Sequence, residues 1–135
     1  MRITPEENEA RILHFKRETV ADGVHVARVA LRRGESSTFH QHTTTRDHFF
    51  VMEGRLTITL RLGTRGADEC YRILGSATTE VSRDHLGEAV HRVRLLPGDM
   101  FRIEPGIAHC AANMDEEHCR FLCIEGIGAY DFVEV

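Results

Sequence analysis

The regular alternation of apolar and polar side chains is the feature that most constrains the fold. It is clearest in residues 55–62, where leucine or isoleucine at every second position alternates with arginine or threonine. Because successive side chains of a β-strand point to opposite faces of a sheet, a period of two indicates a half-buried strand. Comparable short apolar or alternating segments, with glycine or proline at most of the joins, occupy residues 24–31, 91–95, 101–103, 108–112 and 119–125. We therefore predict an all-β sandwich or barrel.

Two segments depart from this strand pattern. Near the start, Thr4 is a favourable N-cap, Pro5 suits the first helical position and Glu7 completes a capping box. We predict a short N-terminal helix there, ending by about Phe15. Residues 63–87 form a polar, glycine-punctuated excursion. We interpret it as an extended surface hairpin, with a lid over the barrel mouth as the alternative.

Length and charge narrow the classes of protein and partner. A chain of 135 residues suits one domain, since two would each be small for a core of their own. The net charge of −4 gives no general attraction to nucleic acid or an anionic membrane, and no apolar run reaches spanning length. The first residues lack the apolar core of a signal peptide, and the four cysteines form no CxxC pair. We expect a cytoplasmic protein with reduced thiols.

Three histidines and an aspartate carry the chemistry. In a strand, His40 and His42 point to the same face, with Cα atoms about 7 Å apart. Asp47 follows after a polar link, and His109 stands just behind a Pro105-Gly106 bend. Each buried imidazole needs a polar partner, and one metal ion would satisfy all three together. Three imidazoles and a carboxylate suit one divalent transition metal, namely Fe, Mn, Ni, Co or Zn.

The spacing of these residues resembles two motifs of the cupin family. The first runs Gly34-x5-His40-x-His42-x4-Asp47-x6-Gly54, and the second comprises Gly98-Asp99 and then Pro105-Gly106-Ile107-Ala108-His109-x3-Asn113. The resemblance implies a single cupin domain over residues 1–135, folded as a double-stranded β-helix (jelly-roll) barrel. It also implies a metal held inside one end of that barrel by His40, His42, Asp47 and His109.

The match departs from the family pattern at two positions. Asp47 stands where cupins usually have glutamate, and one methylene less shortens its reach by about 1.5 Å. It can bind the metal directly, bind through a water, or leave a three-histidine site. Glu104 occupies the position of the usual proline, with Pro105 one place later. His48 would replace Asp47 only if a bulge turned it inward.

Strand parity identifies further pocket and core candidates. Phe49 shares the parity of Asp47 and could line the substrate pocket, although plain core packing explains it as well. Asn113 shares the parity of His109 and could face the cavity or cap a turn. Cys119 and Cys123 share one strand face with Phe121, which indicates small side chains that fill the core.

The metal site leads to three functional hypotheses. The first is a metal-dependent enzyme that acts on a small oxygenated molecule, either as a dioxygenase or by Lewis-acid chemistry of the isomerase, decarboxylase or cyclase type. The second is a non-enzymatic module that binds a sugar or small acid through the metal, and the third is a barrel with a vestigial site. The cupin fold serves many reactions and does not choose among them. The family resemblance also implies a homodimer.

Overall fold

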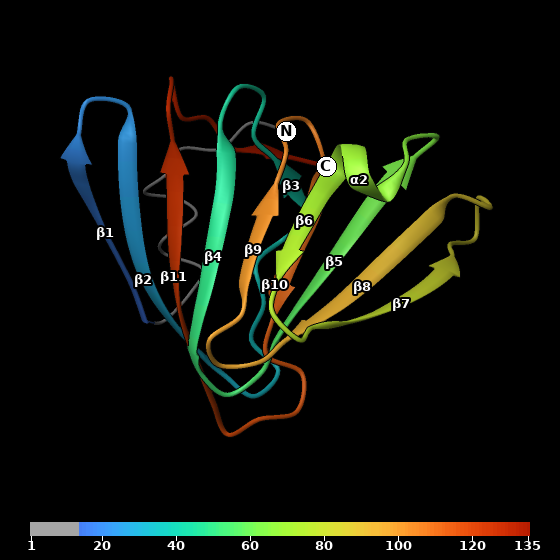
Figure 1. The fold of residues 1–135 in the computed structure, drawn as a ribbon, viewed down its shortest axis with the longest axis horizontal. Helices are drawn as coiled ribbons and strands as arrows, with labels where there is room; N and C mark the ends of the chain where they lie inside the picture. The colour runs from blue at the N-terminus through green and yellow to red at the C-terminus, as the bar shows by residue number, and fades with distance from the viewer. Residues whose placement is uncertain (1–13) are drawn as a thin grey trace.

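The computed structural model describes residues 14–135, with side chains described from Asp22 onward. The predicted N-terminal helix, from Thr4 to about Phe15, lies outside the described part except at its end, where His14 and Phe15 belong to a strand. Two six-stranded antiparallel sheets contain nearly all the regular structure (Figure 1). In spatial order, the first sheet consists of β1 (His14–Ala21), β2 (Val24–Arg32), β11 (His118–Gly126), β4 (Arg46–Glu53), β9 (Met100–Ile103) and β6 (Tyr71–Leu74).

The second sheet contains most of the predicted metal-binding histidines. Its spatial order is β12 (Val133–Glu134), β3 (His40–Gln41), β10 (Ala108–Ala112), β5 (Leu56–Gly63), β8 (Ala89–Leu95) and β7 (Thr78–Arg83). In both sheets neighbours in space are distant in sequence, as where β11 lies between β2 and β4. The predicted jelly roll is confirmed. Its described strands form two sheets and not one closed barrel, because the edge strands of one sheet do not pair with those of the other.

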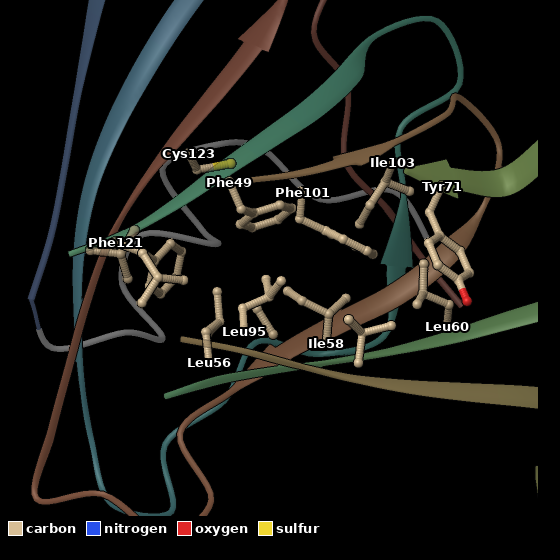
Figure 2. Close-up of a cluster of buried hydrophobic side chains, with 14 of the residues drawn as sticks. Phe49, Leu56, Ile58, Leu60, Tyr71, Leu95, Phe101, Ile103, Phe121 and Cys123 are labelled. Atoms are coloured by element: carbon tan, nitrogen blue, oxygen red, sulfur yellow. The ribbon is translucent and has the colours of Figure 1, made fainter. Parts of the chain in front are cut away.

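The core lies between the two sheets, where their inward-facing side chains meet. Figure 2 shows side chains from the first sheet, including Phe49 and Phe101, facing Leu56 and Ile58 of the second. Burying a leucine or isoleucine side chain of this kind stabilises the fold by roughly 1.5–3 kcal/mol. The four alternating apolar residues of segment 55–62 are all buried, as are Cys119, Phe121 and Cys123 on one face of β11.

A glycine in the first motif allows a close approach between strands. Gly54, directly after β4, has a φ of +78°, a conformation that L side chains rarely adopt. A Cβ built on it would lie 2.2 Å from the main-chain oxygen of His118, the first residue of β11. Any larger residue here would separate the β4–β5 turn from β11, so the motif glycine has a packing role as well as a turn role.

The excursion at residues 63–87 is not a single surface hairpin. A helical turn, α2 (Ala67–Cys70), leads into β6, which pairs with β9 at the edge of the first sheet. The chain then crosses to the second sheet, where the fully exposed β7 pairs with β8 as an outer hairpin. None of these residues lines the cavity beside the predicted metal ligands, so the lid alternative is not supported. Within residues 14–135, no helix has the length and apolar character that a membrane crossing requires.

Candidate metal centre

The four predicted ligands meet between the sheets. His40 in β3 pairs directly with His109 in β10. The Gly106 N–H donates to the main-chain oxygen of His42 at 2.7 Å, so the bend of the second motif holds the end of the first. Asp47 reaches the same point from β4 in the opposite sheet. One potential ligand atom from each residue lies within 4.8 Å of the others, and all four side chains are buried.

Main-chain carbonyls orient all three imidazoles in the same sense. The Nδ1 atoms lie 2.6–2.8 Å from carbonyl oxygens, those of Thr38 for His40, Asp131 for His42 and Ile107 for His109. A carbonyl can only accept, so each Nδ1 carries the hydrogen and donates it. The lone pairs of the three Nε2 atoms are then available toward the cluster. Metal-binding histidines are usually fixed through their second nitrogen in this way.

Asp47 completes a cluster of acceptors that requires a positive charge. Its Oδ2 lies 2.9 Å from His42 Nε2 and 3.2 Å from His109 Nε2. Its Oδ1 is buried with no hydrogen-bond partner among the described residues. Lone pairs facing lone pairs at these distances repel unless a proton or a metal cation lies between them. The residues present therefore fit one divalent metal ion.

Electrostatics within the cluster favour the same conclusion. Burial, together with His109 and His42, lowers the pKa of His40 well below its ordinary value. Burial opposes a charge on His42, but Asp47 and then Glu125 raise the pKa of His42 to about 9. Burial likewise disfavours ionised Asp47, yet His42 and His109 hold its pKa below the ordinary range. Without metal, the cluster at neutral pH thus holds a proton between His42 and Asp47, which a bound metal would displace.

A small cavity adjoins the four residues. Its volume is about 50 Å³, room for a ligand of a few heavy atoms. Apart from the four residues, its wall is mostly apolar and consists of Val29, Leu31, Ser37, Phe49, Ala111, Phe121, Cys123, Glu125, Tyr130 and Phe132. Such a wall excludes water from a ligand held at the metal.

The structure decides between the alternatives for the neighbouring residues. Phe49 belongs to the core and also lines the cavity, edge-on to His109 with ring centroids 6.5 Å apart. Asn113 is fully buried but is not among the cavity-lining residues. Its amide donates to the main-chain oxygens of Leu31 and Glu116 and accepts from the Glu116 N–H, so it caps a turn. His48 lies on the outer face of the first sheet beside Arg102 and is not turned inward.

Sequence reasoning missed the contribution of residues near the C-terminus. Phe132 stacks on His40 with ring centroids 4.0 Å apart and planes at 16°. The main-chain oxygen of Asp131 orients His42, and its carboxylate accepts hydrogen bonds from the Thr43 N–H and hydroxyl at 2.8 and 2.5 Å. No periodicity or motif in residues 127–135 points to these contacts. Glu125 could have been found from the sequence. It lies four residues after the buried Phe121 in the same strand, so its side chain faces the same buried side.

The fold and this cluster agree with the resemblance to cupins that the sequence motifs indicated. No family model matches the sequence, and no curated protein matches it. Among solved structures, a mutant of Bacillus subtilis oxalate decarboxylase is similar at a TM-score of 0.61 and 18% identity, covering 86% of this chain and 25% of that one. A structure of the same enzyme concerned with its Mn(II) centres gives a TM-score of 0.59 at 18% identity, over 86% of this chain and 25% of that one.

A second kind of neighbour has the same fold. Peruvianin-I, a cysteine peptidase from Thevetia peruviana latex, is similar at a TM-score of 0.58 and 18% identity, covering 84% of this chain and 56% of that one. The chain thus spans between a quarter and just over half the length of these proteins. At such identities the likeness concerns the fold. The chain has the cupin fold, with a buried group of residues suited to a divalent metal.

Proposed function

We propose that this protein is a metal-dependent cupin enzyme that acts on a small oxygenated molecule. The ligands would be Nε2 of His40, His42 and His109 and a carboxylate oxygen of Asp47. The observation that carries this proposal is the convergence of three buried imidazoles and one buried carboxylate on one point, each imidazole being held at its other nitrogen.

The chain's own residues would perform three tasks. The carbonyl-bound imidazoles keep their Nε2 lone pairs aimed at one point without reorganisation when the ion binds. The apolar wall of the cavity excludes water, and Phe132 packs His40 in place. A bound divalent metal would supply Lewis-acid polarisation of a ligand oxygen. The four residues would hold the metal beside the cavity, whose small volume favours a ligand of a few heavy atoms.

Among the Lewis-acid reactions, decarboxylation is the activity named for one protein of similar fold, oxalate decarboxylase. A dioxygenase reaction would need Fe²⁺ held by the same four residues. A non-enzymatic module that uses the metal to anchor a small ligand is the alternative. These three differ in measurable ways: product formation without O₂, product formation with O₂ uptake, or binding without turnover.

Metal analysis tests the proposal directly. Protein purified without an affinity tag should contain about one equivalent of a divalent transition metal per chain. His42→Ala should remove that metal while the far-ultraviolet circular dichroism stays that of a β-protein. His118→Ala is the matched control, because His118 is solvent-exposed and distant from the cluster in the fold. Folded wild-type protein that neither contains nor takes up metal would contradict the proposal.

A further inference from the structure

The outer face of the first sheet carries a cavity that is separate from the metal centre. Its volume is about 360 Å³, and it lies over the adjacent strands β4, β9 and β6 (Figure 1). The residues that line it are His48, Arg72, Leu74, Met100, Phe101 and Arg102. None of them lines the smaller cavity beside the four predicted ligands. His48 follows the inward-facing Asp47 and points to the opposite side of β4, so the sheet separates the two cavities.

The register of the three strands arranges the outward-facing side chains in two parallel rows. His48 pairs with Arg102, and Arg102 pairs with Arg72, which gives a basic row across the strands. The next row, two residues along each strand, is apolar and consists of Phe50, Met100 and Leu74. Neighbouring strands lie about 4.8 Å apart, so each row is about 10 Å long. The cavity therefore offers positive charge on one side and hydrocarbon on the other.

The two arginines of the basic row have little negative charge around them. A guanidinium stays protonated in proteins, so both carry a full positive charge. Arg72 forms no ion pair within residues 22–135. Arg102 Nε lies 3.0 Å from Glu104 Oε1 but makes no hydrogen bond there, whereas Glu104 accepts a hydrogen bond from Arg46. One carboxylate thus serves two arginines, and no carboxylate lines the cavity.

The apolar row is open to solvent, although it is continuous from strand to strand. Leu74 is 66% exposed and Met100 is 42% exposed. On the other side of β4, Phe50 pairs with the half-buried Leu122 of β11, which extends the apolar surface. Single exposed apolar side chains are common, but a contiguous patch beside a cavity is typical of a binding site.

We propose that this cavity binds a small anionic molecule with a hydrocarbon portion. The anionic group accepts hydrogen bonds from Arg72 and Arg102, and the hydrocarbon lies along Met100 and Leu74. The volume falls in the range of small-molecule sites. A second copy of this chain fits less well, because it would bring two positively charged cavities together. This inference does not depend on the metal centre.

Three probes separate the role of charge from that of hydrocarbon. Octanesulfonate carries both, methanesulfonate carries only the charge, and 1-octanol carries only the hydrocarbon. Sulfonates are weak metal ligands, so the metal centre interferes little. In isothermal titration calorimetry of the full chain, below the critical micelle concentration, octanesulfonate should bind about tenfold or more tightly than either other probe. Equal binding of 1-octanol would refute selection for anions, and equal binding of methanesulfonate would refute the role of the apolar row.

Three variants at exposed positions locate the binding. Arg72→Gln should weaken octanesulfonate binding about fivefold and leave that of 1-octanol within about twofold, because it removes charge and keeps most of the side chain. Leu74→Ser should weaken the binding of both by about threefold or more. Arg120→Gln is the matched control, since Arg120 lies on the same outer face, outside the cavity, and pairs with Glu53. It should change neither affinity.

The remaining outcomes would overturn the inference. Unchanged octanesulfonate affinity in both Arg72→Gln and Leu74→Ser would place its binding elsewhere, and no binding in wild type would refute the site. Binding only to phosphatidylserine vesicles, lost in Arg72→Gln, would assign this face to an anionic membrane. Dimerisation in sedimentation experiments, lost in Leu74→Ser, would assign it to a second copy. Each of these results leaves the metal centre untouched.

Discussion

Replacing Asp131 by alanine should weaken metal binding, although Asp131 is not one of the predicted ligands. That carboxylate accepts two hydrogen bonds from Thr43, next in sequence to His42. The main-chain oxygen of the same residue holds His42 Nδ1 at 2.6 Å. Without the carboxylate, both the Thr43 turn and the carbonyl that orients the imidazole lose their anchor.

The expected size of the effect follows from these contacts. Each hydrogen bond to a charged group contributes about 1.5–3 kcal/mol when buried, but Asp131 is only half-buried, so we expect a loss of about 1–2 kcal/mol in unfolding free energy. Loss of a group that orients a metal ligand typically weakens metal binding by about tenfold or more. Asp131→Asn keeps an acceptor for the Thr43 N–H and should recover part of both losses.

The assay compares metal affinity with stability in matched variants. Competition with a chromophoric chelator gives the affinity, and urea unfolding of metal-free protein gives the stability. Asp84→Ala is the control, since Asp84 accepts from the N–H groups of Leu86 and Glu88 in the exposed β7–β8 turn. It should leave the metal affinity unchanged. Equal metal affinities in Asp131→Ala and wild type would refute the positioning role.

Three further outcomes are expected. Asp47→Asn should bind metal about tenfold or more weakly in chelator competition, because a neutral amide is a poor ligand, whereas an unchanged affinity would indicate a three-histidine site. Because the pKa of His42 is raised to about 9 in the folded protein, its charged form stabilises the metal-free state below the ordinary value of 6.5. That contribution should disappear as pH rises from about 6.5 through 9, and His42→Gln should flatten this part of a urea-midpoint profile, which a parallel decline in the variant would contradict. Ile58→Ala, which empties a fully buried position between the sheets, should cost about 2–5 kcal/mol in urea unfolding, with the exposed Val81→Ala within about 0.5 kcal/mol of wild type.

Local sequence pattern was sufficient for much of the fold and of the cluster. Alternation predicted the strands because each buried face depends on side chains two residues apart, whichever strand lies beside it. It also placed His40 and His42 on one side of the chain. The spacing of the two motifs then linked them to Asp47 and His109, and the structure brings all four together. The turn at Gly54 could be predicted for the same local reason, since a positive φ favours glycine.

Only the tertiary structure decided which strands became neighbours and what surrounds the cluster. The excursion at residues 63–87 divides between the edges of both sheets, which its weak periodicity could not indicate. The bond from His42 to the Asp131 carbonyl spans 89 residues, and it uses a main-chain group that every residue possesses, so no side-chain pattern marks it. The positions of Phe132 and Glu125 beside the cluster likewise depend on contacts between segments that are far apart in the sequence. The sequence of one segment indicates which of its side chains will be buried. It does not indicate which distant segment they will contact, because those contacts form only when the sheets pack.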